Sequence, residues 1–300
     1  MINRLFNVPL MVCLCLMLEC SCTTQRFLPS NFATETSFNK DAGLGNNLFI
    51  TVNLEGGEKL LFAVDTGSPY TVLSQTLESK LGKCLGTKKA SYGLYGGRSV
   101  RIYNEPKLYL HNVKVMTGDH VLTDDLATIF GNQPVMGILG MDCLKHYCVQ
   151  LDFVTNKMRL LGTDEVKKTR DWGKPYPLHI FFGQVWLHGD FFGGGDTYFR
   201  IDTGWLADGA LEPKLYEKVL AKQKTGETIQ LKSPTGATFY QTYFTNFVFG
   251  NQSHHRLVLD NYPTLSMNII GLRFLMRNHV TLDFPNRVMY LEPRGEPSRN

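Results

Sequence analysis

The sequence is poor in cysteine once its first 22 residues are set aside. Four of the seven cysteines lie before residue 23, and only Cys84, Cys143 and Cys148 follow. An odd set of three argues against a disulfide framework, and no two of these cysteines have the CxxC spacing of a redox or zinc-binding pair. Cys143 and Cys148 stand in an apolar stretch, so we expect both to be buried small hydrophobic side chains.

Other motifs with a defined chemistry are absent as well. The sequence has no GxSxG segment, no Walker-type phosphate loop and no HExxH zinc motif. Its 31 lysines and arginines never form a long block, and the net charge of +4 is too small and too spread to indicate a nucleic-acid partner. With 43% hydrophobic and 19% charged residues, the chain is expected to be globular. We therefore expect no nucleic-acid partner, no metal and no organic cofactor.

The first 22 residues have the pattern of a signal peptide. Arg4 precedes an apolar run over residues 8–18, and small polar residues follow. The run is shorter than the roughly 20 residues that span a bilayer, which leaves an uncleaved anchor as the minor alternative. Cys20 or Cys22 could accept a lipid and tether the chain to a membrane, although Glu19 fits that pattern poorly. The chain is thus predicted to be exported: periplasmic, envelope-attached or secreted.

The chain contains an internal repeat with a period near 130 residues. The tripeptide Asp-Thr-Gly occurs at residues 65–67 and again at 202–204. Each copy ends an apolar, strand-like run that follows a glycine-rich turn, and each leads into a segment of helical period. One such tripeptide would be weak evidence for a site, but two in matched surroundings are strong.

The later part of each copy repeats in the same register. "GILG" at residues 137–140 matches "NIIG" at 268–271, and a short segment expected to be helical follows each. "VQLDFVTNKMRLL" at 149–161 matches "VTLDFPNRVMYLE" at 280–292, and both predict a hairpin with a turn built around Asn. In both copies the glycine stands 12 residues before the aspartate of the hairpin, so the two halves are expected to share one fold.

Two copies of one half-site predict a site on a pseudo-twofold axis, where an element of one half meets its counterpart. The meeting elements would carry Asp65 and Asp202, the candidate catalytic pair. The glycine of each triplet lets the backbone approach the carboxylates and donate amide hydrogen bonds to them. The threonine hydroxyls can tie the two loops together across the axis. The supporting loop residues expected from this arrangement are Thr66, Gly67, Ser68, Thr203 and Gly204.

These segments resemble the aspartic peptidases, most of all the retropepsin-like kind. The resemblance covers most of residues 45–292 and rests on "FAVDTGS" with "GILG" and on "FRIDTGW" with "NIIG". It implies an all-β, bilobal, pseudo-twofold acid-protease fold: two retropepsin-like lobes with short helices and a cleft between them. It also implies an endopeptidase in which a water is activated between Asp65 and Asp202, two carboxylates that share one proton. The partner would be a peptide or protein substrate, and the chain would act as a monomer.

The resemblance also implies a flap. "SYGLYGGRSV" at residues 91–100 is a glycine-rich hairpin with aromatic residues, which suits a mobile cover over a bound substrate. Tyr92, Gly93 and Tyr95 are its candidate substrate-binding residues. The alternative interpretation is an ordinary exposed hairpin.

Trp205 departs from the pattern of the family, which has serine, threonine or alanine after the glycine. The Ser68 hydroxyl can bond to the outer oxygen of Asp65, whereas an indole on a long, rigid side chain cannot do this for Asp202. Trp205 could line a substrate pocket, pack in the core or obstruct the pair. An obstructed pair would make the chain a non-catalytic exported peptide-binding protein that keeps the fold.

The predicted organisation follows from these features. Its segments are a leader (1–22), an N-terminal extension (23–44), an N-terminal lobe (45–161), an interlobe linker (162–177), a C-terminal lobe (178–293) and a polar tail (294–300).

Overall fold

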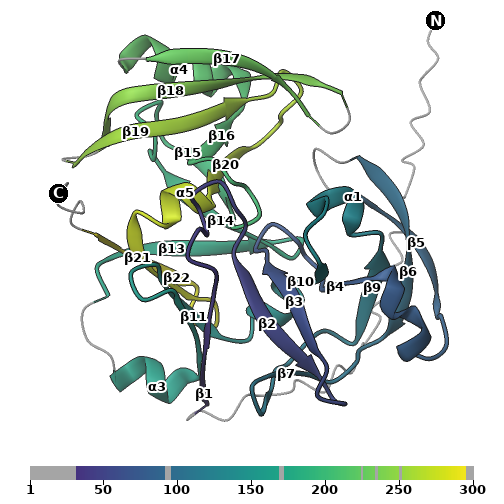
Figure 1. Ribbon diagram of the computed structural model, residues 1–300. Coiled ribbons are helices and arrows are strands. Elements are labelled where there is room, and N and C mark those ends of the chain that lie inside the picture. The colour runs from purple at the N-terminus through teal and green to yellow at the C-terminus, as the bar shows by residue number, and fades with distance from the viewer. Residues whose placement is uncertain are drawn as a thin grey trace, which may run out of the picture.

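The computed structural model describes residues 32–91, 96–168, 172–223, 226–233, 236–249 and 252–294. It is mostly β structure in two sheets, with a few short helices, which confirms the expected all-β fold (Figure 1). The predicted leader and almost all of the tail lie outside the described residues. Within the described part of the chain, no helix is both long and apolar enough to cross a membrane.

The first sheet belongs to the N-terminal lobe and has the strand order β5-β6-β9-β4-β10-β3-β2-β7-β8. Its strands are β2 (Phe49–Leu54), β3 (Lys59–Val64), β4 (Val72–Ser74), β5 (Gly86–Ser91), β6 (Gly97–Asn104), β7 (Leu108–Leu110), β8 (Val113–Lys114), β9 (His120–Asp124) and β10 (Val135–Leu139).

The second sheet joins the two lobes and continues through the C-terminal one, in the order β1-β12-β11-β21-β22-β13-β14-β15-β20-β16-β19-β18-β17. Its strands are β1 (Ala33–Ser37), β11 (Cys148–Asp152), β12 (Lys157–Leu161), β13 (Lys174–Phe181), β14 (Gln184–Gly189), β15 (Thr197–Asp202), β16 (Gly209–Leu211), β17 (Glu227–Lys232), β18 (Thr238–Phe249), β19 (Gln252–Asn261), β20 (Asn268–Gly271), β21 (Asn278–Asp283) and β22 (Val288–Pro293).

The helices are short and lie between strands along the chain. They are the 3-10 helix η1 (Gln75–Lys80), α1 (Ala127–Phe130), α2 (Met141–Leu144), α3 (Thr163–Lys168), α4 (Pro213–Lys222) and α5 (Leu272–Leu275). Four of them, η1 and α4 after the two Asp-Thr-Gly triplets and α2 and α5 after the two Ile/Leu-Gly segments, are the helices expected from the repeat.

The two lobes share one strand arrangement around their Asp-Thr-Gly triplets. In the N-terminal lobe β10 runs parallel to β3 and antiparallel to β4, and β4 runs parallel to β9. In the C-terminal lobe β20 runs parallel to β15 and antiparallel to β16, and β16 runs parallel to β19. The residue before each aspartate is also in the same register, since Val64 lies opposite Leu139 and Ile201 opposite Ile270.

The repeated hairpins meet at the centre of the molecule. β11 and β12 form one hairpin and β21 and β22 the other, as the sequence predicted, and β11 pairs antiparallel with β21. In that pairing Gln150 lies directly opposite Thr281, its own counterpart in the repeat. Equivalent residues face each other only where a twofold axis passes between them, so the pseudo-twofold axis runs through this pair.

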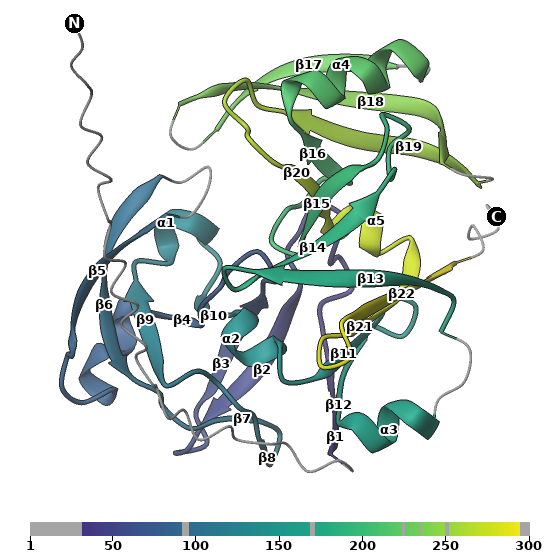
Figure 2. The ribbon, with the colours of Figure 1, turned by 180° about the vertical axis from the view of Figure 1, so that it is seen from behind.

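Strand β13 connects this central sheet to the C-terminal lobe. Residues 174–177 of β13 pair with β22, and residues 178–181 pair with β14. Figure 2 shows β13 passing from the central hairpins to β14 and β15. Residues 162–177, predicted as a linker, therefore contain helix α3 and the first half of a strand.

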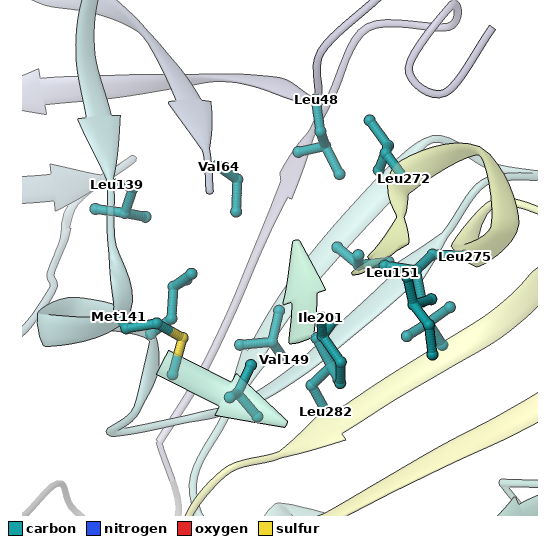
Figure 3. Packing of buried hydrophobic residues seen from close by; sticks show 14 of the residues in the cluster. Leu48, Val64, Leu139, Met141, Val149, Leu151, Ile201, Leu272, Leu275 and Leu282 are labelled. Carbon is teal, nitrogen blue, oxygen red and sulfur yellow. The ribbon is translucent and has the colours of Figure 1, made fainter. Parts of the chain in front are cut away.

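One large apolar cluster lies under the two triplets and the central sheet. Val64 and Ile201, which directly precede the two aspartates, belong to one cluster of buried side chains together with Val149, Leu151 and Leu282 of the central strands (Figure 3). Val149 and Leu151 are two residues apart on β11, so their side chains lie on the same face of the strand. This core fixes the ends of β3 and β15 relative to each other.

Two glycines let a second loop cross close behind each triplet. A Cβ atom on Gly140 would lie 2.3 Å from the Tyr70 carbonyl oxygen, and one on Gly271 would lie 2.2 Å from the Ala207 carbonyl oxygen. Real Cβ atoms do not approach backbone oxygens this closely, so only glycine fits these positions without moving the loop.

Replacing Gly271 by alanine is therefore expected to destabilise the protein by about 2–4 kcal/mol, because backbone rather than a flexible side chain must move. Urea denaturation measures the loss. Gly56→Ala is the matched control, since a Cβ there meets no atom within 4 Å, and it should change the free energy of unfolding by less than about 0.5 kcal/mol. Equal stability of both variants would contradict the crossing.

Candidate active site

The two Asp-Thr-Gly loops are tied together by their threonines. The Thr66 amide donates to the Thr203 hydroxyl at 3.0 Å, and the Thr203 amide donates to the Thr66 hydroxyl at 3.1 Å. Each hydroxyl then donates across the axis, that of Thr66 to the Ile201 carbonyl at 2.9 Å and that of Thr203 to the Val64 carbonyl at 2.7 Å. Both threonines are buried. Four hydrogen bonds without access to water thus hold the ends of β3 and β15 side by side.

The same arrangement brings Asp65 and Asp202 together. Each carboxylate accepts a hydrogen bond from the glycine of its own triplet, Asp65 Oδ1 from the Gly67 amide at 2.7 Å and Asp202 Oδ1 from the Gly204 amide at 3.0 Å. The two carboxyl groups lie close enough for the negative charge of Asp202 to raise the pKa of Asp65. The two aspartates that the sequence analysis pairs therefore lie close together where the two loops meet.

Each glycine also packs against the carboxyl group of the opposite lobe. A Cβ on Gly67 would lie 2.4 Å from the Asp202 carboxyl carbon, and one on Gly204 would lie 2.8 Å from that of Asp65. Any side chain at either position would push the two carboxyl groups apart.

Asp65 is a strongly perturbed acid. The pKa of Asp65 is raised to about 7: burial raises it most, the nearby negative charge of Asp202 adds to the rise, and the Gly67 amide and the positive charge of Arg200 act in the opposite direction. Two carboxyl groups this close retain one proton between them up to neutral pH.

Arg200 is a member of this site that the sequence analysis missed. Its Nη2 lies 2.5 Å from Asp202 Oδ2, so Asp202 accepts from Gly204 with one oxygen and from a guanidinium with the other. The signal was present in the sequence: residues two apart on a strand point to the same face, and Arg200 stands two before Asp202. The counterpart of Arg200 in the first repeat is Ala63, which gave no reason to look there.

The Trp205 side chain makes its contacts within its own lobe, the C-terminal one. Its indole N–H donates to Asp260 Oδ2 at 3.0 Å, and its ring meets Tyr262 edge to face at a centroid distance of 5.6 Å. The side chain is half-buried. The group that reaches the Asp202 carboxylate is therefore Arg200, while Trp205 braces the loop against β19.

Ser68 does not make the hydrogen bond expected of it. Its hydroxyl donates to the Tyr70 carbonyl at 2.7 Å, and its amide donates to the Asp65 carbonyl at 3.3 Å. The chain turns at Pro69, which brings the Tyr70 carbonyl within reach of the Ser68 hydroxyl. The hydroxyl therefore binds this carbonyl and not the Asp65 carboxylate.

A second polar side-chain contact lies behind each triplet, and its chemistry differs between the lobes. In the N-terminal lobe the Thr71 hydroxyl donates to Asp142 at 2.7 Å. The equivalent positions of the C-terminal lobe hold Asp208 and Arg273, 3.3 Å apart, and Arg277 also binds Asp208 at 2.7 Å. The same contact is thus made by a neutral donor in one lobe and by arginines in the other.

The predicted flap is only partly described. β5 and β6 form an antiparallel hairpin, with Ser91 opposite Gly97, but the candidate residues Tyr92, Gly93 and Tyr95 lie outside the described residues. The base of the hairpin contacts the first triplet loop, because Lys88 of β5 places its ammonium 3.4 Å from the centre of the Tyr70 ring.

The remaining cysteines are consistent with the sequence analysis. Cys143 and Cys148 are buried and free, as expected, and Cys84 is exposed and free. Over the ranges that the structure describes, no group of three or more His, Cys, Asp or Glu side chains could hold a metal ion.

Comparison with known proteins gives a match to one protein family. Residues 50–143 match the family model of aspartyl proteases. The match covers about a third of the chain; it includes Asp65 and ends before Asp202. A search of curated proteins finds no match. The family match supports an aspartic protease family for the chain, and it covers the first half-site.

The raised pKa of Asp65 predicts a pH-dependent stability. A carboxyl group whose pKa is higher in the folded than in the unfolded state ionises more easily after unfolding. Its ionisation therefore lowers the free energy of unfolding, and this loss grows from about pH 4 to about pH 7. Asp65→Asn removes this loss. The free energy of unfolding of the variant, relative to the wild type, should therefore rise by about 4 kcal/mol over that interval in urea denaturation. A difference that stays constant with pH would contradict the assignment.

The contact between Trp205 and Asp260 predicts a second effect. Burial raises the pKa of Asp260 to about 6, while hydrogen bonds from Gln241 and Trp205 oppose that rise. Trp205→Phe removes a donor to the ionised carboxylate, so we expect a loss of about 1–2 kcal/mol at about pH 8 and a smaller loss at about pH 5. The matched control is Trp172→Phe, because the Trp172 indole N–H is buried without a hydrogen-bond partner in the described structure. A loss that does not change with pH would argue against the contact.

Proposed function

We propose that this chain is an aspartic-type endopeptidase whose catalytic residues are Asp65 and Asp202. One observation carries the proposal: the reciprocal threonine hydrogen bonds hold the two triplet loops together, and each glycine packs against the carboxyl group of the other lobe, so the two carboxyl groups lie close together. The aspartyl protease match over residues 50–143 supports the same reaction class.

The geometry supports hydrolysis through a single shared proton. The ionised carboxylate of the pair accepts a proton from a water molecule, whose oxygen forms a bond to the carbonyl carbon of the peptide. The protonated carboxyl group gives its proton to the carbonyl oxygen, which yields a neutral diol. The first group then protonates the amide nitrogen as the carbon–nitrogen bond breaks, and the second recovers its proton from a hydroxyl group of the diol. The pair ends with one proton, as it began.

A second candidate function is a non-catalytic peptide-binding protein with this fold. The observation that favours it is the ion pair between Arg200 and Asp202, because a guanidinium at Oδ2 competes for the carboxylate that would activate water. The intact pair and the perturbed pKa of Asp65 favour the enzyme.

We also propose that the enzyme works outside the cytoplasm. The support is the sequence pattern of residues 1–22, in which Cys20 or Cys22 could carry a lipid tether. Its substrates would then be peptides or proteins of the envelope or of the medium.

Asp65→Asn and Asp202→Asn test the proposal. Each should lower the rate of cleavage of a peptide library, followed by mass spectrometry, by at least about 1,000-fold, because neither the water nor the carbonyl can be activated by one carboxyl group alone. Asp152→Asn is the matched control: it makes the same chemical change at the end of β11 and should retain cleavage.

The outcomes separate the two functions. Cleavage that survives in either variant would overturn the proposed mechanism. A wild-type protein that binds library peptides without cleaving them, with the same affinity in both asparagine variants, would instead support the peptide-binding alternative.

A further inference from the structure

Arg200 breaks the symmetry of the site, and its placement has a consequence for the reaction. We propose that Arg200 is a positioning residue that holds Asp202 as the ionised base and thereby assigns the shared proton to Asp65. The inference rests on the proposed function, since it concerns the roles of the same two carboxyl groups. It goes beyond that function because it gives each aspartate one fixed role at the start of the reaction.

The contacts of the two aspartates differ on this one point. Both accept an amide hydrogen bond at Oδ1. Asp202 also receives a cation at Oδ2, with both partners largely buried: the Arg200 side chain is 13% exposed and that of Asp202 is 8% exposed. A cation at this distance favours the charged form of a carboxyl group, so the proton resides on the partner, Asp65.

The fold does not require an arginine at this position. The equivalent residue of the N-terminal lobe is Ala63, which lies opposite Phe49 and packs in a small apolar cluster. Arg200 lies opposite Trp186 in the same strand pairing of the other lobe. An apolar residue is therefore compatible with this strand arrangement, and the presence of a cation needs another explanation.

Burial of a guanidinium is costly unless it is well paired. The Arg200 Nε atom is buried and has no hydrogen-bond partner in the described part of the chain, so this atom does not help to offset the cost. The ion pair with Asp202 is the contact that does offset it. The carboxylate of Asp202 is thus the reason for the position of Arg200.

The strands beside Arg200 carry few other titratable side chains in the described part of the chain. On β20 the residue opposite Arg200 is Ile269, which carries no charge. On β13 and β14 the titratable side chains of this face are His179 and His188, which both contact the Tyr198 ring. From the N-terminal lobe the titratable group is Asp65 itself. These side chains remain unchanged when Arg200 is replaced.

With fixed roles, Asp202 takes the proton of the attacking water and Asp65 gives its proton to the carbonyl oxygen. The reaction requires one proton on the pair, so activity is lost at low pH when the pair takes up a second proton and at high pH when it loses the first. The positive charge of Arg200 opposes the second proton and lowers the pKa of Asp65, although burial still keeps that pKa near 7. Both limits of the pH profile therefore depend on Arg200.

The first test is the pH profile of peptide cleavage by the full chain. In Arg200→Gln both limbs should move to higher pH, by about 1 unit or more, and Arg200→Lys should restore most of the wild-type profile because it restores the charge. A merely structural role would lower activity at every pH without moving the limbs, and unmoved limbs would overturn the inference.

Failure of the inference is distinguishable from failure of the proposed function. If Asp65→Asn and Asp202→Asn abolish cleavage but Arg200→Gln keeps the wild-type limbs, only the role of Arg200 is wrong. If cleavage survives in the asparagine variants, the proposed function itself is wrong.

A second test needs no substrate. Carboxyl-carbon NMR of protein labelled at aspartate follows each titration directly, and in the wild type the step near neutral pH should vanish in Asp65→Asn. Should Arg200→Gln fold poorly, Arg200→Met offers an apolar side chain of similar length, and the step should again move upward by about 1 unit or more. Assignment of the wild-type step to Asp202 would overturn the inference even if neither variant folds.

Discussion

The site depends on the reciprocal hydrogen bonds between Thr66 and Thr203. Each threonine uses its amide to bind the other hydroxyl and its own hydroxyl to bind a carbonyl across the axis. The aspartates stand next to these threonines, so these buried threonine contacts hold the two aspartates close to each other. The raised pKa of Asp65 follows from that enforced proximity together with burial. The shared core under Val64 and Ile201 keeps the two strand ends from separating.

Much of this arrangement could be predicted from the sequence because it repeats. The register of the two copies predicted the hairpins, the helices after the glycines and the meeting of Asp65 with Asp202, and the pairing of Gln150 with Thr281 places the axis between the copies. The rest lies where the copies differ. Arg200 and Trp205 have no counterpart of the same chemistry, and the path of the Ser68 hydroxyl depends on a turn at Pro69. A repeat indicates what two halves share and cannot indicate where a unique side chain goes.

The differences between the lobes follow one pattern. Ala63 in one lobe corresponds to Arg200 in the other, and the pair Thr71 and Asp142 corresponds to Asp208 and Arg273. In both cases the N-terminal lobe keeps a small or neutral group and the C-terminal lobe places an arginine against a carboxylate. The backbone around the axis is nearly symmetric, whereas the charge around it is not. The two aspartates therefore occupy equivalent positions in different electrostatic surroundings.

The pairing of β11 with β21 also bears on how the molecule reaches its folded state. The two strands that meet at the axis are separated by well over a hundred residues, and β1 and β22, in the same central sheet, come from opposite ends of the described chain. Contacts between such distant segments form late, after local hairpins, because closing a long loop costs entropy. During synthesis the N-terminal lobe can fold around Asp65 while Asp202 and β21 are still unmade. A chain that has not yet reached residue 202 therefore carries one carboxylate and no pair, and the pairing of β11 with β21 can form only after residue 283 has been added.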